Sequence, residues 1–394
     1  MRRIDLQKAQ AARSNTIRDI NRQIVLNYVR EREPISRAEI ARETDLQRST
    51  VSSIVEVLQA EGLVEEIGEG ESTGGRRPTM LRLRSTGAVA IGVAITPTGT
   101  TVATSNLAGR ILEREEFPAD PSWETTQEKI IKSIRAMYLR HPAVEAIGLS
   151  LPGLVDKERG IALYIPYFQW RNIRVKEELE RATGLGVTLD NDANAAALAE
   201  LWFGRQGAGQ ARDFLMVLVG AGIGVGTVFD GQVYRGQHGA AGEFGHMIIG
   251  ENPPTPCSCG SYDCWEAFAS ERAALARYNA TTGLSDCADF GELIERALRD
   301  EAPARDALLE TSHFLGIGVS NLIVGFSPGA VVVSGPIVRV WPLIVNSLNE
   351  TVDRSIRRGL PAAPIIPSTL GEQPALMGAL SLVLAHKFAS IQSA

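Results

Sequence analysis

The chain has 394 residues, 44% of them hydrophobic and 22% charged, which is the balance of a globular protein with room for two or three domains. Its first residues, MRRIDLQKAQ, contain no apolar run, and the strongly apolar run at residues 214–229 is short and holds four glycines. We therefore expect neither a secretory signal peptide nor a membrane-spanning helix. With only four cysteines, the chain is expected to be cytoplasmic, with its thiols reduced.

The N-terminal part of the chain predicts three short helices. Apolar residues recur at helical spacing over residues 15–33, and a proline ends that segment. Ser36 and Glu39 form the sequence pattern of a capping box, so a second helix is expected to start there. A third helix is expected over residues 47–62, where it would bury its apolar face and end at a glycine. A short helix, a short turn and another helix make a helix-turn-helix motif.

Two short alternating strands, LVEEI and TMLRLR, follow these helices and flank a loop with two arginines, which is typical of a β-wing. The first 85 residues carry 15 Lys/Arg against 13 Asp/Glu, whereas the whole chain has a net charge of −6, so a polyanion would meet this end. We predict a winged helix-turn-helix that binds double-stranded DNA; a helical domain that only mediates dimerisation is the alternative. The predicted DNA-binding residues are Arg48, Ser49, Thr50, Ser52, Ser53, Arg76 and Arg77.

After residue 85 the pattern changes to short buried strands that alternate with helices. AVAIGVAITPTGTTVATSNLAGRIL predicts hairpin strands, and GVTLDNDANAAALAELWFG predicts a strand that runs directly into a helix. A second β-meander starts at Phe214, and we predict an α/β body of two related lobes with a cleft between them. The predicted domains are residues 1–85 for DNA binding, 86–195 for the first lobe, completed by a C-terminal helix over 376–394, and 196–375 for the second lobe.

Three of the four cysteines lie in one short stretch, CSCGSYDCWE, with a histidine eleven residues before the first of them. Three thiolates and one imidazole are the ligands of a structural zinc ion, and four protein ligands leave no open position for an activated water. A redox pair and coincidental core cysteines are the alternatives, but Cys-x-Cys is a poor redox spacing. We predict structural Zn²⁺, with Cys287 as an ordinary buried thiol. The predicted ligands are His246, Cys257, Cys259 and Cys264.

Four segments of the body resemble successive motifs of the ROK family of sugar kinases and sugar-responsive repressors. They are SLPGLVD at residues 150–156, DNDANAAALAE at 190–200, AAGEFGHM at 240–247 and CSCGSYDCWE at 257–266. The resemblance covers nearly the whole chain and implies an α/β, two-lobed, actin-like (ribonuclease H-like) fold of the sugar-kinase type. The winged helix followed by GGRRP resembles the repressor branch of the family.

The resemblance also implies a sugar-binding set in the cleft. Its members are Asn191, Asp192, Glu243, His246 and Glu266. Carboxylate, amide and imidazole groups suit a ligand whose hydroxyls each donate and accept hydrogen bonds. In the family's kinases, the residue at the position of Asp192 is the general base; without the resemblance, Asn191-Asp192 would pass as a helix N-cap. One sugar-binding motif differs from the family pattern. The segment that ends at Trp170 has the family's tryptophan but lacks its usual asparagine.

The phosphate-binding motifs of the family's kinases are degenerate here. Where those kinases carry Asp-x-Gly-Gly-Thr, this chain has Ala94 for the aspartate and Thr96-Pro97 for the glycines. Proline removes a backbone N–H that a phosphate would use. A second turn reads Gly220-Ala221-Gly222 instead of Gly-Thr-Gly, and Ser334-Gly335 replaces a pair of glycines. We predict that ATP is not used and that Asp192 is a vestigial base.

These observations predict a sugar-responsive transcriptional regulator, a repressor of carbohydrate-metabolism genes, that binds operator DNA as a homodimer or higher homo-oligomer. The effector would be a sugar or sugar derivative bound in the kinase-like cleft. An ATP-dependent kinase of hexoses or amino sugars with an attached DNA-binding head is the first alternative, which Asp192 favours and the degenerate phosphate motifs oppose. A binding or scaffold protein is the second.

Overall fold

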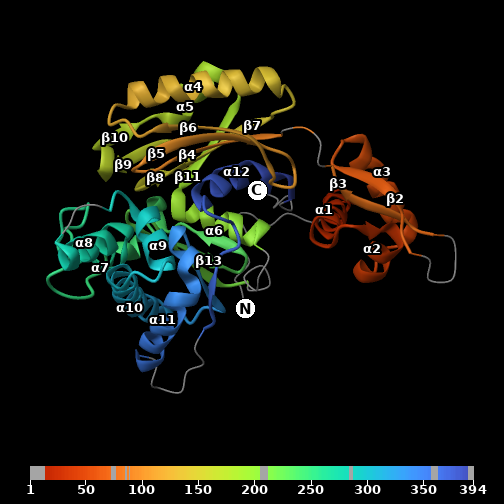
Figure 1. The fold of residues 1–394 in the computed structure, drawn as a ribbon. Helices are drawn as coiled ribbons and strands as arrows, with labels where there is room; N and C mark the ends of the chain where they lie inside the picture. The colour runs from red at the N-terminus through yellow and green to blue at the C-terminus, as the bar shows by residue number, and fades with distance from the viewer. Residues whose placement is uncertain are drawn as a thin grey trace. The chain divides into compact units, whose positions relative to one another are not determined.

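The computed structural model describes residues 14–71, 77–84, 87, 89–204, 212–283, 287–355 and 363–388. They form two compact units. The first unit contains Met1–Val89, Ser105–Leu112 and Leu384–Ala394, and the second contains Ala90–Thr104 and Glu113–Val383. Figure 1 shows the helices and strands of each unit.

The first unit is a winged helix-turn-helix, as predicted. Its helices are α1 (Ser14–Arg32), α2 (Arg37–Thr44) and α3 (Arg48–Ala60). The capping box at the start of α2 is confirmed: the hydroxyl of Ser36 accepts from the backbone N–H of Glu39, whose carboxylate accepts from the backbone N–H of Ser36. Packing of the three helices rests on fully buried apolar side chains, among them Val25, Leu26, Ile40, Val51 and Leu58.

The wing is a three-stranded sheet in the order β1-β3-β2, made of β1 (Ile35–Ser36), β2 (Val64–Glu69) and β3 (Thr79–Leu83). Both strands of the predicted wing are confirmed and pair antiparallel. Strand β1 was not predicted, because two residues are too few to show a period; tertiary pairing with β3 creates this strand.

The last turn of α12 (Pro374–Phe388) is part of this first unit. The side chain of Phe388 is fully buried, and the guanidinium of Arg30 lies 5.1 Å from the centre of its ring. The amide of Asn27 donates to the carbonyl oxygen of Phe388 at 2.9 Å. The end of the chain's last described helix thus completes the core around α1.

The first lobe of the second unit is built on a five-stranded sheet in the order β11-β7-β4-β5-β6. The strands are β4 (Ala90–Ile95), β5 (Gly99–Ser105), β6 (Ile111–Pro118), β7 (Ala146–Leu151) and β11 (Gly186–Asn191). Helices α4 (Trp123–Arg140) and α5 (Val175–Thr183) lie on one face and α12 on the other (Figure 1). Glycine is required where α12 approaches: a Cβ on Gly148 would lie 1.8 Å from the carbonyl oxygen of Ala379. A small sheet, β8 (Leu154–Asp156), β9 (Ile161–Ile165) and β10 (Trp170–Ile173), extends this lobe.

The second lobe has a sheet in the order β14-β13-β12-β15-β16. The strands are β12 (Phe214–Val219), β13 (Ile223–Phe229), β14 (Gln232–Tyr234), β15 (Ala330–Ser334) and β16 (Ile365–Pro367). Helix α6 (Asp192–Phe203) packs on this sheet through alanines that meet the strand glycines 224 and 226. The remaining helices are α7 (Trp265–Ala269), α8 (Glu271–Thr282), α9 (Phe290–Leu298), α10 (Ala302–Phe326) and α11 (Trp341–Ser355). They enclose the largest apolar core, which includes Trp265, Leu315 and Val333.

Helix α10 has 25 residues and is apolar enough to cross a membrane by length and composition, but most of it is buried within the second lobe. A Cβ on Gly318 of this helix would lie 2.0 Å from the ring of Trp265, so the two helices touch through the glycine. We read α10 as the central helix of the lobe's core.

Candidate functional site

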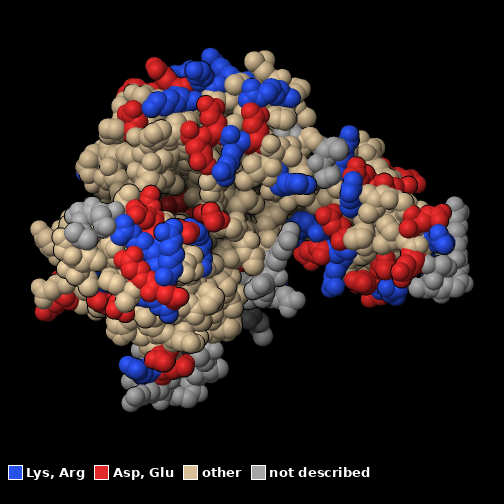
Figure 2. Space-filling model, viewed as in Figure 1, with Lys and Arg blue, Asp and Glu red and all other residues tan. Residues whose placement is uncertain are grey.

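A cavity of about 650 Å³ lies between the two lobes of the second unit. Its walls are the β4–β5 turn, the start of α6, the β12–β13 turn, the 3-10 helix Glu243–His246 and the residues that lead into α12. Figure 2 shows the surface hollowed between the lobes, with acidic side chains at the margin of the hollow. All five residues of the predicted sugar set, Asn191, Asp192, Glu243, His246 and Glu266, line this cavity.

Asn191 ends β11 and begins α6. Its side-chain oxygen accepts from the backbone N–H groups of Ala193 (3.0 Å) and Asn194 (3.2 Å), which makes it the helix N-cap. Its amide nitrogen donates to the carbonyl oxygen of Gly153 at 3.0 Å. Asn191 is therefore both the helix N-cap and a residue of the cavity wall. The cap fixes the turn that carries Asp192.

Asp190, one residue before this turn, is held by two cations. Its buried carboxylate accepts from Arg235 at 2.7 and 2.8 Å, and the ammonium of Lys157 lies 3.7 Å away. Arg235 directly follows β14 of the second lobe, whereas Asp190 lies in β11 of the first. This ion pair joins the lobes directly behind the cavity and fixes the end of β11.

Among the carboxylates of the sugar set, Asp192 has the pKa that is raised furthest from its ordinary value. Burial raises the pKa of Asp192 to about 7, and the charge of Glu243 adds to the effect. Its Oδ1 also accepts from the backbone N–H of Ala193 at 2.8 Å, which partly offsets the rise. A carboxylate with a pKa near neutrality can accept a proton from, or hydrogen-bond to, a ligand hydroxyl.

Glu243, His246 and Glu266 join the cavity to the cysteine loop. One ring nitrogen of His246, Nε2, lies 3.5 Å from the carboxylate of Glu243, and the other, Nδ1, lies 3.3 Å from the sulfur of Cys257. Glu266 accepts hydrogen bonds from the backbone N–H and the hydroxyl of Ser258, at 3.2 and 2.8 Å. The loop that carries the thiols therefore also orients the two glutamates.

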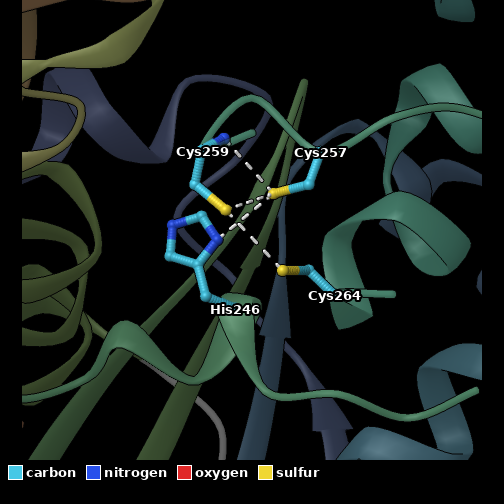
Figure 3. Close-up of side chains that lie close together, drawn as sticks. All are labelled: His246, Cys257, Cys259 and Cys264. Atoms are coloured by element: carbon cyan, nitrogen blue, oxygen red, sulfur yellow. Dashed lines mark hydrogen bonds between the residues drawn. The ribbon is translucent and has the colours of Figure 1, made fainter. Parts of the chain in front are cut away.

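The three clustered cysteines and His246 point toward one another (Figure 3). One ligand atom from each of them lies within 4.8 Å of all the others. The sulfurs of Cys259 and Cys264 are 3.8 Å apart, and those of Cys257 and Cys259 are 3.2 Å apart. In a tetrahedral site with metal–sulfur bonds of about 2.3 Å, sulfurs lie about 3.8 Å from one another. The Cys259–Cys264 distance matches this value and the Cys257–Cys259 distance is shorter, so the group could hold a metal ion, and its donor chemistry is compatible with zinc.

Two residues of the cavity escaped the sequence analysis. Tyr167 lines the cavity, and a Cβ on Gly222 would lie 2.7 Å from its hydroxyl oxygen and 2.6 Å from the carboxylate of Glu266. Trp170, which the family resemblance singled out, is buried instead, with its ring stacked on Phe168. Glu271 also lines the cavity, although nothing in its local sequence pattern marks it as more than a first-turn helix residue.

The β4–β5 turn lines the cavity, as does the β12–β13 turn; the sequence analysis predicted degenerate phosphate motifs at both. The backbone N–H of Thr96 donates to the carbonyl oxygen of Gly99 at 2.8 Å, and the N–H of Gly99 donates to the hydroxyl of Thr96 at 3.2 Å. Pro97 has no N–H. Three of the four residues of the turn therefore have no free backbone donor to offer a phosphate.

In the first unit, the predicted DNA-binding residues of α3 share one accessible side of the helix. Arg48, Ser49 and Ser53 are exposed and Thr50 and Ser52 are half-buried, whereas Val51, Ile54, Val55 and Leu58 face the core. Arg77 is exposed beside the wing; Arg76 lies outside the described residues. Arg48 and Arg77 form no ion pair with another described residue, whereas Arg82 on β3 pairs with Glu65 at 2.7 Å.

Comparison with known proteins bears on both units. The model of the ROK family matches residues 90–386, and that of the MarR family matches residues 24–77. The chain is similar to the xylose repressor of Bacillus spizizenii, with 32% identity over 376 residues that cover 94% of this chain and 96% of that protein.

Two solved structures extend the likeness. A ROK family transcriptional regulator, a homologue of the E. coli MLC protein, superposes with a TM-score of 0.75 at 24% identity over 95% of this chain and 98% of its own. A ROK family glucokinase from Streptomyces griseus, in complex with glucose and AMPPNP, has a TM-score of 0.67 at 30% identity and covers 75% of this chain and 98% of its own. The regulator thus matches nearly the whole chain, and the kinase matches three quarters of it.

Proposed function

This chain belongs to the ROK family, and we propose that it is a sugar-responsive DNA-binding transcriptional repressor. The observation that carries the proposal is the union, in one chain, of a MarR-type winged helix with a two-lobed ROK body that holds a cavity of about 650 Å³. The xylose repressor to which it is similar covers both parts. A sugar that binds the two lobes differently in their open and closed arrangements would shift the population of the DNA-binding form.

The DNA-binding side of the proposal rests on the polar face of α3. Short hydroxyls and one guanidinium on an exposed helix face suit phosphate oxygens and base edges, while the opposite face anchors the helix in the core. The free guanidiniums of Arg48 and Arg77 supply the positive charge. The test is an electrophoretic mobility shift with the upstream region of the chain's own gene and its neighbours, with and without a sugar panel; a protein that binds none of this DNA would refute the repressor.

The effector side rests on the five cavity residues of the sugar set. The carboxylates of Asp192, Glu243 and Glu266 and the free ring nitrogen of His246 provide paired acceptors and a donor for ring hydroxyls. Tyr167 adds a hydroxyl on the same wall. Isothermal titration with unmodified sugars tests this set directly: Glu243→Gln is expected to weaken the sugar's affinity while operator affinity without sugar stays unchanged.

We propose that a structural zinc ion occupies the group formed by His246, Cys257, Cys259 and Cys264. Its chemistry would be to neutralise the thiolates and lock the loop, whose His246 contacts Glu243 and whose Ser258 donates to Glu266. Four protein donors leave no position for a reacting water, so the ion has no part in a reaction. Metal analysis of the purified protein tests the site.

The second candidate is a sugar kinase, which the pKa of Asp192 near 7 favours, because a general base works best near neutral pH. Phosphoryl transfer also needs donors and a metal around the nucleotide's phosphates. The self-bonded β4–β5 turn and Ala94 at the position of the family's aspartate oppose this. We propose that the protein is not an enzyme; an ATP-consumption assay with the sugar panel that gave ordinary kinase rates, about 1–100 s⁻¹, would overturn this.

We further propose that the protein acts in the cytoplasm as a homodimer, since helix-turn-helix regulators read two half-sites about 34 Å apart with two heads. Sedimentation in the presence of a two-half-site operator tests the stoichiometry: two chains per operator are expected.

A further inference from the structure

The charged side chains that line the cavity are acidic. Six carboxylate residues line it, and none of the described lining residues is a lysine or an arginine. The six are Glu116, Asp192, Glu243, Glu266, Glu271 and Glu372. Two of them, at the rim, are balanced from outside: Arg114 lies 3.6 Å from Glu116, and Arg339 lies 3.7 Å from Glu372. The other four carboxylates form no ion pair with a described lysine or arginine.

Glu271 is the inner carboxylate that the sugar set does not include. It begins α8, and its backbone N–H donates to the carbonyl oxygen of Gly220 at 2.9 Å, which places it behind the β12–β13 turn. The same turn contains Gly222, which lies close to the carboxylate of Glu266 in the sugar set. The turn therefore connects the sugar set to Glu271 along the cavity wall. This half of the cavity is the one that the degenerate phosphate motifs line.

The carboxylate of Glu271 pairs with no side chain or backbone group of the described residues. None of the hydrogen bonds or ion pairs among the described residues involves it, and it is only partly accessible. Burial raises the pKa of Glu271 to about 7, and the charge of Asp289 contributes. A half-buried carboxylate that pairs with no described residue costs stability unless a ligand supplies its donors.

Two kinds of group could meet this wall, and their electrostatics differ. A phosphoryl group carries about two negative charges at neutral pH and needs N–H donors or cations. The described lining has six carboxylate residues and no lysine or arginine, and in the β4–β5 turn three of four residues have no free backbone N–H. A sugar hydroxyl is uncharged and donates, so it satisfies a carboxylate without repulsion.

We infer that Glu271 is a specificity-determining residue of the effector cavity, whose carboxylate accepts from a ligand hydroxyl and repels phosphoryl groups, so that the effector is an unphosphorylated sugar. This rests on the proposed function, because it concerns the ligand of the same cavity. The inference names the class of ligand. It also assigns a binding role to Glu271, which lies in the half of the cavity that a kinase of this fold uses for its nucleotide.

Isothermal titration of the full-length protein with matched pairs tests the inference. The pairs are D-xylose, D-glucose and N-acetyl-D-glucosamine, each beside its terminal phosphate ester. In the wild type, at least one free sugar is expected to bind at least tenfold more tightly than its phosphate ester. Glu271→Gln is expected to narrow that ratio by about tenfold, whereas Glu271→Asp, which keeps the charge, is expected to retain most of it. Glu158→Gln, which removes one exposed negative charge outside the cavity, is the matched control and should behave as the wild type.

The outcomes separate this inference from the proposed function. A phosphate ester that binds as tightly as its free sugar, or a Glu271→Gln variant with an unchanged ratio, overturns the role of Glu271 and leaves the sugar-responsive repressor standing. If no sugar binds in either form, the effector itself is refuted together with this inference. Operator binding without sugar shows that each variant is folded.

Discussion

Replacing Glu271 by glutamine should stabilise the protein in alkaline solution and do little in acid. The carboxyl group has a pKa of about 7 in the folded chain, raised by burial from an ordinary value of 4.5. At about 1.36 kcal/mol for each pH unit, this difference corresponds to about 3 kcal/mol of destabilisation when the group is ionised in both the folded and the unfolded chain. Glutamine has the same shape but no charge to desolvate.

The sign of the pH dependence follows from the raised pKa. Above about pH 7 the folded chain holds an ionised, buried carboxylate, so the full destabilisation is present. As the pH falls from about 7 toward 4.5, the folded chain takes up the proton before the unfolded chain does, and the destabilisation disappears. The advantage of Glu271→Gln over the wild type is therefore close to its full value near pH 8 and falls to roughly a quarter of that value near pH 5.

Thermal unfolding at about pH 8 and pH 5 measures this difference, with Glu158→Gln as the control for a simple change of net charge. A change of 1 kcal/mol moves the Tm by about 2–4 °C in domains of about 150–250 residues, so a rise of several degrees is expected at the higher pH. A Glu271→Gln variant that is less stable than the wild type at pH 8, or equally stabilised at both pH values, would show that the carboxylate is satisfied within the protein and that the reasoning is wrong.

Three further results are expected. Metal analysis should find about one zinc per chain, and Cys264→Ser should lose the ion and unfold at lower temperature; a full zinc content in that variant would remove the cysteine from the ligand set. Arg48→Ala should weaken operator binding and lower its salt dependence by about one ion, whereas Arg82→Ala, whose guanidinium is already paired with a glutamate, should bind nearly as the wild type; equal losses would refute the distinction. Arg235→Gln should destabilise the second unit by about 3 kcal/mol in urea unfolding and weaken the sugar's affinity, because it leaves the buried carboxylate of Asp190 with one distant cation. An unchanged sugar affinity would show that this ion pair does not influence the cavity.

Local signals were sufficient for much of the fold. The capping box at Ser36 and Glu39 was predicted from two residue types at fixed spacing, and the structure has both of its hydrogen bonds. The hairpin before Gly99 and the direct passage from β11 into α6 were also predicted correctly, since each is set by residues adjacent in sequence. Strand β1 was missed, because its two residues form a strand only through pairing with β3.

Part of the candidate site could also be predicted from the sequence, and part depends on the tertiary structure. The cluster of one histidine and three cysteines could be predicted, because spacing and ligand chemistry limit what such residues do, and the structure brings their donor atoms together. Tyr167 could not be predicted as a cavity residue, nor Trp170 as a core residue, because neighbours in sequence point to different sides of a short turn. The clamp of Arg235 on Asp190 joins residues 45 positions apart and depends on the packing of one lobe against the other.

The sequence by itself determined the elements, the order of the motifs and the metal-binding chemistry, since these depend on residue type and short spacing along the backbone. Only the tertiary structure decided which charges share the cavity. Glu271 is an ordinary first-turn glutamate of a helix in the sequence. In the structure it lines the cavity wall and pairs with no described residue, because the turn at Gly220 closes over the start of that helix. Desolvation and long-range charge act through space, so they appear only when the lobes are assembled.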